Sequence, residues 1–105
     1  MNEQDFSTEI EDLLAIYHWR WTHFRPARTE RGWRTALSGD KGFVDYVAVR
    51  DGRCLFIELK GDKSRLTPEQ EEWARVLQAC PGIEYYCWKP GDYERVVEVL
   101  KENGK

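Results

Sequence analysis

Two acids and a lysine stand out because they occur in a stretch that is otherwise mainly apolar. Asp45, Glu58 and Lys60 lie within residues 43–60, a segment typical of two short strands. A carboxylate in an apolar strand is costly to bury unless it has a partner or a function. A divalent cation held between the two carboxylates would neutralise them, and oxygen ligands suit Mg²⁺ or Mn²⁺. Lys60, two residues beyond Glu58, projects from the same strand face.

The turn between these strands determines which residues face each other. Asp51-Gly52 favours a two-residue type I′ turn, because Asp tolerates and Gly readily accepts the positive φ needed at both central positions. This turn pairs Arg50 with Arg53, and the same register places Asp45 directly opposite Glu58. Opposed like charges on an antiparallel pair are destabilising, so we expect a compensating group. A solvated Glu-x-Lys pair would give the same local pattern, which leaves an ordinary ion-pair cluster as the alternative.

Length and composition indicate a single domain over residues 1–105. The chain is 41 % hydrophobic and 33 % charged, which is typical of a globular protein of this size. No apolar run approaches the roughly 18 residues that would span a membrane, and the N-terminus has no signal-peptide pattern. We therefore expect a cytoplasmic protein with no membrane partner. Cys54, Cys80 and Cys87 are unclustered and set among apolar residues, which favours buried thiols over a disulfide or a zinc site.

Charge is unevenly distributed along a chain whose net charge is −3. Residues 1–19 contain five acids and no basic residue, whereas residues 20–41 contain six basic residues and two acids. A basic segment beside acidic residues suits an enzyme that acts on a polyanion through a cation, although it also suits a solvated loop. The residues expected to contact DNA are Arg25, Arg28, Arg31, Arg34, Lys41, Lys63 and Arg65.

Hydrophobic periodicity and turn residues predict an α/β fold with the element order αβββαβα. The expected elements are a helix at about 5–18 with Asp5 or Ser7 as N-cap, a strand at 19–25, the two hairpin strands, a helix from residue 67, a strand at 83–88 and a helix from residue 90. Residues 26–42 are expected to form a long connection. Both faces of the hairpin strands are apolar, so a central mixed sheet should be covered by helices on both sides.

The first helix offers acids that could join the site. A rotation of about 100° per residue places Glu9 at the edge of the apolar stripe, with Glu11 and Asp12 turned farther away. We therefore expect Glu9 to lean toward the site, although an acid in the first turn also has a structural role through the helix macrodipole. His23 lies in the expected strand at 19–25, beside aromatic side chains. A histidine in such a position is more often structural than catalytic.

Gln70 has two possible roles. Thr67-Pro-Glu-Gln70 has the pattern of a capping box, with proline at the first helical position, so it predicts the start of a helix. The Gln70 side chain would close this box without any part in chemistry. The second role, implied by the family resemblance given below, is to point into the site, and both roles stay open.

Taken together, these motifs resemble the VRR-NUC family of the PD-(D/E)XK nuclease superfamily. The residues that carry the resemblance are Asp45, Glu58-Leu-Lys60, Leu66-Thr-Pro-Glu-Gln70-x-x-Trp73, Ser7-Thr-Glu9 and Tyr86-x-Trp-Lys-Pro90. The similarity covers most of the chain and implies the αβββαβα fold. The chain departs from the family at Val44, because members usually have proline before the site aspartate. That difference affects local geometry more than chemistry.

The resemblance implies a set of roles for the residues already singled out. Asp45, Glu58 and the backbone carbonyl of Leu59 would hold Mg²⁺ or Mn²⁺, with Glu9 as a further possible ligand. Lys60 would be the catalytic base partner, and Gln70 would point into the site. The family resembles structure-selective DNA endonucleases, and its small stand-alone members, often from phages or bacteria, resemble Holliday-junction resolvases that act as homodimers. The alternative is a DNA-binding or adaptor domain that keeps the nuclease fold without turnover.

Overall fold

The computed structural model describes residues 1–24, 27–29, 32–34 and 38–103 as an α/β fold. Its elements are α1 (Glu3–Ile16), β1 (Arg20–His23), β2 (Ala27–Thr29), β3 (Gly32–Arg34), β4 (Tyr46–Arg50), β5 (Arg53–Leu59), α2 (Pro68–Gln78), β6 (Glu84–Trp88), the 3₁₀ turn η1 (Pro90–Asp92) and α3 (Tyr93–Lys101). When the short strands β2 and β3 are set aside, the helices and strands follow the expected order αβββαβα.

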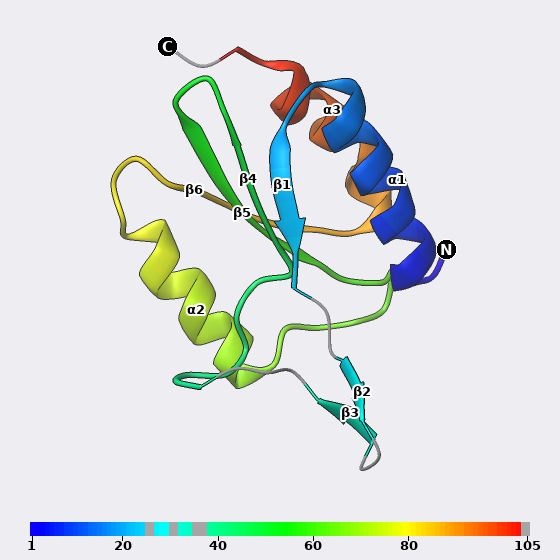
Figure 1. Cartoon of the computed structure of the whole chain (residues 1–105), viewed down its shortest axis with the longest axis vertical. Helices are drawn as coiled ribbons and strands as arrows, with labels where there is room; N and C mark the ends of the chain where they lie inside the picture. Colours follow the sequence, from blue (N-terminus) through cyan, green and yellow to red (C-terminus); the bar gives the residue numbers. More distant parts are fainter. Residues whose placement is uncertain (25–26, 30–31, 35–37, 104–105) are drawn as a thin grey trace.

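The main sheet is mixed and has the strand order β1-β4-β5-β6. Strands β1, β4 and β5 are antiparallel neighbours, and β6 pairs in parallel with β5 after the crossover through α2. Helices α1 and α3 lie together on one side of the sheet and α2 on the other (Figure 1). The expectation of helices on both faces is confirmed only in part. Val49, on the α2 face, is 41 % exposed, so a single helix covers that face incompletely.

The core lies between the sheet and the helices α1 and α3. The apolar stripe of α1 packs there with the inward face of the sheet and with α3. Fully or nearly fully buried members are Phe6, Ile10, Leu13, Leu14, Trp19, Tyr46, Ala48, Leu55, Ile57, Leu59, Trp88, Val96, Val99 and Leu100. Alternate residues of β5 point into this core, which leaves the intervening ones, including Glu58, on the α2 face.

The first helix begins earlier than its apolar stripe indicates. Asn2 is the N-cap, and its side chain accepts a hydrogen bond of 2.8 Å from the backbone N–H of Asp5. The assignment of Asp5 or Ser7 as N-cap was therefore wrong. Periodicity marks the first residue that packs against the core, Phe6, whereas a cap needs only an acceptor three residues before a free N–H.

Residues 26–42 contain more structure than the expected connection. Strands β2 and β3 pair in antiparallel register, with Arg28 opposite Trp33 and Ala27 opposite Arg34. They form a separate two-stranded sheet that projects from the end of the main sheet where β1 finishes (Figure 1). Strands of three residues are too short to show a two-residue period in the sequence.

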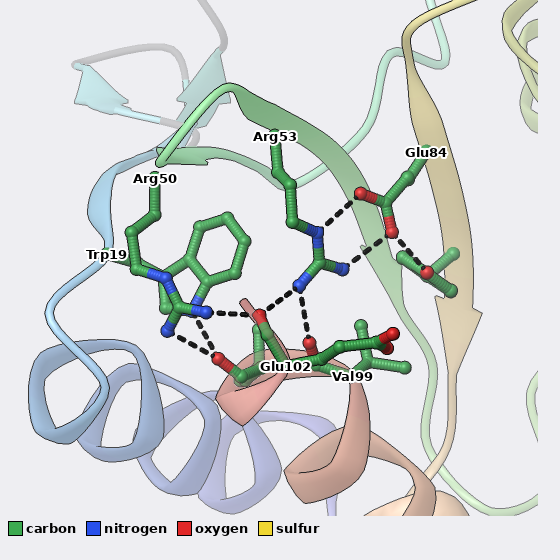
Figure 2. A network of polar contacts seen from close by, with 8 residues as sticks. Trp19, Arg50, Arg53, Glu84, Val99 and Glu102 are labelled. Atoms are coloured by element: carbon green, nitrogen blue, oxygen red, sulfur yellow. Dashed lines mark hydrogen bonds and ion pairs between the residues drawn. The ribbon is translucent and has the colours of Figure 1, made fainter. Parts of the chain in front are cut away.

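The turn of the β4–β5 hairpin fastens the end of α3. Arg50 and Arg53 face each other across the ladder, and their guanidinium carbons lie 4.6 and 5.1 Å from the centroid of the Trp19 ring. Figure 2 shows both guanidinium groups directed at the last turn of α3. Arg50 donates to the Leu100 carbonyl at 2.7 Å, and Arg53 donates to the Val99 carbonyl at 2.8 Å.

These contacts resolve the repulsion between two opposed arginines. Both also donate to the Glu102 carbonyl, and Arg53 makes a bidentate ion pair with Glu84 at 2.7 and 2.8 Å. Cations near the carbonyl end of a helix are favourable, since the free carbonyls there carry partial negative charge. The Arg53 guanidinium lowers the pKa of Glu84 and stays paired with it. This end of the hairpin therefore has a structural role, because Arg50 and Arg53 bind the end of α3. We call these two residues and their partners the arginine clasp.

The remaining expectations concern membranes and thiols. No helix in the described residues is long and apolar enough to cross a bilayer. The three cysteines are free thiols, as expected, but only Cys54 and Cys87 are half-buried. Cys80 is exposed at the end of α2, so its assignment as a buried thiol was wrong. It lies beyond the last residue of that helix, where the apolar stripe no longer meets the sheet.

Candidate metal and nucleic-acid site

The turn has the backbone that the sequence predicts. Asp51 and Gly52 have φ of 50° and 81°, so both central positions are in the left-handed region, as a type I′ turn requires. The pairs run from Arg50 opposite Arg53 to Tyr46 opposite Ile57. The register derived from the turn is thus confirmed over the whole of β4.

At Asp45 the regular ladder ends, so the expected direct opposition to Glu58 is not a regular strand pair. The Asp45 carbonyl accepts from the Phe24 N–H of the β1 side at 2.8 Å, but its own N–H turns to the Ile57 carbonyl at 3.0 Å. Its carboxylate accepts a 2.8 Å hydrogen bond from the backbone N–H of Leu59. Asp45 therefore lies at the end of β5, where its carboxylate holds the Leu59 N–H and its charge raises the pKa of the neighbouring Glu58.

Glu58 is a buried acid. Its exposed fraction is 2 %, and it is the one charged side chain that is buried among the described residues. Burial raises the pKa of Glu58 well above the ordinary 4.5, and the hydrogen bond to Asp45 and the Asp45 charge raise it further, while Lys60 opposes them. A pKa raised in this way favours the neutral form of Glu58, so this carboxyl holds a proton more readily than an exposed one would.

Gln70 fills both of the roles that the sequence left open. The Gln70 side-chain oxygen accepts from the backbone N–H of Thr67 at 2.9 Å. The backbone N–H of Gln70 donates to the Thr67 hydroxyl, which completes the capping box. Its side-chain nitrogen lies 3.5 Å from a carboxylate oxygen of Glu58. The Gln70 side-chain amide therefore caps the start of α2 with its oxygen, while its nitrogen faces the buried Glu58 carboxyl.

A glycine brings the chain before Asp45 against α2. Gly42 has φ of 89°, and a Cβ placed there would lie 2.6 Å from the Cβ of Glu69 and 3.0 Å from the Gln70 nitrogen. Only glycine permits this approach without a shift of the backbone. The contact places the segment leading to Asp45 beside the first turn of α2, where Gln70 lies.

Lys60 lies near the two acids. A further acid near it, Glu3, was not predicted from the sequence. The backbone N–H of Lys60 donates to the Trp88 carbonyl at 2.9 Å, which extends the β5–β6 pairing past Leu59. Partial burial and the Asp45 charge raise the pKa of Glu3, and Lys60 opposes this rise. Glu3, an exposed residue at the start of α1, is therefore close enough to Asp45 and Lys60 for their charges to affect its pKa.

Glu9 stays a prediction as a site residue. Its side chain is half-buried and makes no hydrogen bond or ion pair with any residue that the structure describes. Glu11 contacts the sheet, because the Tyr46 hydroxyl donates to it at 2.5 Å and His23 lies 3.2 Å from it. The helical projection was wrong for Glu11, which it turned away from the sheet.

The basic residues divide into those that the structure places and those that it does not. Lys41, Lys63 and Arg65 are exposed, and Lys63 and Arg65 lie in the loop that joins β5 to α2 just after Lys60. Arg28 and Arg34 occupy backbone positions in β2 and β3. Arg25 and Arg31 lie outside the described residues, so their expected DNA contacts stay predictions.

Asp45, Glu58 and the Leu59 carbonyl are the groups that could hold a divalent cation. The described residues contain no group of three or more His, Cys, Asp or Glu side chains arranged to hold a metal. Two carboxylates meet, and the carbonyl of Leu59 follows Glu58 directly. Mg²⁺ usually binds through one or two carboxylates, with waters and substrate phosphates completing its shell. The buried Glu58 and its neighbour Asp45 therefore fit a cation of this kind, which needs few protein ligands.

A pocket of about 430 Å³ lies apart from this pair, on the outer side of α2. It is lined by Asp40, Lys41, Glu69, Glu72, Trp73 and Val76. Its acidic rim is unsuited to phosphate, so the hollow does not extend the carboxylate site.

Comparison of the chain with protein-family models, with curated proteins and with solved structures gives no significant match. The geometry of the carboxylate pair and its neighbours therefore carries the functional proposal.

Proposed function

We propose that the chain is a divalent-metal-dependent endonuclease of the PD-(D/E)XK, VRR-NUC-like type that cleaves branched DNA. The observation that carries this proposal is the buried Glu58 carboxyl, which lies near Asp45 with Lys60 and Gln70 beside it. A purely structural strand position would be more stable with an apolar residue, since burying a carboxyl there is unfavourable. A cation that displaces the proton of Glu58 gives this arrangement a purpose.

Each residue has a role in phosphodiester hydrolysis. Asp45, Glu58 and the Leu59 carbonyl would hold Mg²⁺ or Mn²⁺, with Glu9 as a further possible ligand and Glu3 adding negative charge from the start of α1. The bound cation would polarise a phosphoryl oxygen and lower the pKa of a coordinated water. Lys60 would orient the attacking water and stabilise the charge that develops on the phosphate. Gln70 would hold Glu58 in orientation from the start of α2.

The basic residues would hold the DNA on either side of this centre. Lys63 and Arg65 follow the catalytic strand directly, and Lys41 precedes Asp45. Arg28 and Arg34 belong to a hairpin that projects from the same end of the sheet (Figure 1). A two-stranded β-ribbon fits the major groove of a duplex. Two such chains in a homodimer would engage two arms of a junction, as the resemblance implies.

The experiment that tests the function is a cleavage assay over four DNA structures. Single-stranded, duplex, flapped and four-way-junction DNA are incubated with the purified chain in Mg²⁺ and in Mn²⁺. We expect cleavage of branched DNA that is lost when EDTA removes the cation. Absence of cleavage of every substrate with both metals would contradict the proposal.

The Lys60→Ala variant tests the chemistry. We expect a loss of about 10²–10⁴-fold in the cleavage rate, the usual effect of removing a proton-transfer or charge-stabilising group. The fold should survive, because Lys60 is half-buried and only its backbone is hydrogen-bonded in the sheet. Lys101→Ala, at the exposed far end of α3, is the matched control and should cleave normally. Equal activity in both variants would contradict the role of Lys60.

A second function is supported by the small donor set. Because the described residues lack a three-ligand cluster, the chain would also suit a DNA-binding or adaptor domain that has the nuclease fold but no turnover. Such a domain would bind junction DNA with equal affinity in the presence and absence of Mg²⁺. Junction binding in a gel-shift assay, combined with the absence of cleavage, would favour it.

A further inference from the structure

A second cluster of polar side chains lies one residue away from Asp45. The Tyr46 hydroxyl donates to a carboxylate oxygen of Glu11 at 2.5 Å, and the same oxygen lies 3.2 Å from Nδ1 of His23. The His23 ring stacks on the Tyr46 ring, with centroids 4.1 Å apart and an interplanar angle of 13°. Tyr46 has no exposed surface, whereas His23 and Glu11 are partly exposed.

The position of this cluster matters more than its composition. His23 and Tyr46 are the last strand pair between β1 and β4, and the next step along is the hydrogen bond from Phe24 to the Asp45 carbonyl. Asp45 is the residue at which the ladder changes direction, because its N–H turns from the β1 side to Ile57. A single carboxylate, Glu11, thus joins both strands at the step before Asp45 departs from the regular sheet.

The geometry points to Glu11, Tyr46 and His23 as a positioning unit that fixes the Asp45 carboxylate for cation binding. This inference rests on the proposed function, since it concerns the same site. The unit acts through the backbone. The Tyr46 hydroxyl is bound to Glu11 of α1 and the Asp45 carbonyl accepts from the Phe24 N–H, so both sides of the peptide that joins Tyr46 to Asp45 are anchored. The Asp45 carboxylate then stays on the Leu59 N–H, at 2.8 Å, beside Glu58.

The sheet supplies a matched control. Ile57 of β5 has two tyrosine neighbours, Tyr46 on β4 and Tyr86 on β6. The Tyr86 hydroxyl also donates to a carboxylate, that of Glu84, at 2.6 Å, and its ring also stacks on an aromatic neighbour, Trp88. Tyr86→Phe therefore removes the same kind of hydrogen bond from the same sheet face, away from the carboxylate pair.

The test compares Tyr46→Phe with Tyr86→Phe by calorimetric titration with Mn²⁺ and by amide hydrogen exchange. We expect Tyr46→Phe to weaken Mn²⁺ binding roughly 10–100-fold, the usual effect of removing a group that orients a metal ligand. The Leu59 amide should exchange faster in that variant, because its acceptor is the Asp45 carboxylate. Tyr86→Phe should change neither quantity, although it lowers the melting temperature by a similar amount. Glu11→Gln keeps an acceptor for the hydroxyl and should have a smaller effect than Tyr46→Phe.

The outcomes separate this inference from the proposed function. Unchanged Mn²⁺ affinity and unchanged Leu59 exchange in both Tyr46→Phe and Glu11→Gln would overturn the positioning role. A wild-type chain that binds no Mn²⁺ would overturn the proposed function, and Leu59 exchange alone would then decide whether the unit positions Asp45. If Tyr46→Phe fails to fold, the same two measurements on Glu11→Gln decide the question.

Discussion

The two ends of the β4–β5 hairpin each bring like charges together, and the protein treats them differently. At the turn, Arg50 and Arg53 are opposed, but backbone carbonyls of α3, the Trp19 ring and Glu84 surround their guanidinium groups. At the open end, Asp45 and Glu58 lie close together beside one backbone N–H and an amide nitrogen 3.5 Å away. The arginine end has its counter-charges built into the fold, whereas the carboxylate end has two acids and one neighbouring lysine, Lys60.

The difference teaches which like-charge pair is structural and which is a candidate site. A pair whose partners all come from the chain contributes to stability and needs nothing more. A buried pair that keeps a proton in place of a cation costs stability while the cation is absent. Proximity of like charges alone therefore does not identify a site, and the number of internal partners does.

The largest effect is expected at the turn. Arg53→Met removes the bidentate partner of Glu84 and the donor to the Val99 carbonyl, so we expect a loss of about 3 kcal/mol in the free energy of unfolding. Chemical denaturation measures it. Arg75→Met, which breaks an exposed ion pair with Glu72 on α2, is the control and should change the free energy of unfolding far less, because solvent screens that pair. Equal losses in the two variants would remove the structural role of the arginine end.

A smaller loss is expected near the carboxylates. Gly42→Ala combines a positive φ with a Cβ that meets Glu69, so we expect it to cost about 2–3 kcal/mol. Gly39 has a similar φ of 93° but open space around a Cβ, so Gly39→Ala should show the backbone strain alone, about 1 kcal/mol. Denaturation of both variants separates packing from strain. Identical values would mean that Gly42 does not hold this segment against α2.

The smallest expected change has the opposite sign. Glu58→Gln keeps the shape and the hydrogen bond to Asp45 without a proton to lose, so the metal-free protein should gain about 1–2 kcal/mol at pH 7. The sign follows from the raised pKa of Glu58. Between pH 4.5 and the folded pKa, the native state binds the extra proton, so wild-type stability falls as the pH rises, by at most about 1.4 kcal/mol per unit.

The pH profile also sharpens the contrast between the ends. The pKa of Glu84 is lowered by Arg53, so its contribution is present above its unfolded pKa and is lost as the pH falls. Glu58→Gln should flatten the loss above pH 4.5, and Glu84→Gln should flatten the loss in acid. A Glu58→Gln variant with the wild-type profile would show that Glu58 is ionised in the folded protein.

Much of the frame was accessible from local sequence rules. Asp51-Gly52 determined the turn and the register of β4 with β5, and Thr67 with Gln70 marked the start of α2. These features depend on residues within a few positions of each other, which is why sequence reasoning reaches them. The same rules gave the order of the main elements.

The rest depended on contacts between distant segments. The turn of the Asp45 N–H toward Ile57 follows from how β1, β4 and β5 end together, which no local pattern encodes. The contacts of Glu11 with Tyr46 and His23 depend on how α1 packs against β1 and β4. The arginine clasp needs the end of α3 to lie beside a turn about 50 residues earlier in the chain.

The most direct measurement is a calorimetric titration of the wild-type chain and Glu58→Gln with Mn²⁺ in two buffers of different ionisation enthalpy. If the carboxylate pair is a cation site, the wild type binds one Mn²⁺ per chain and releases about one proton, because the cation replaces the proton that the raised pKa keeps on Glu58. Glu58→Gln should bind far more weakly. Equal binding by both proteins, or saturable binding by neither, would contradict the assignment of this end of the hairpin as a metal site.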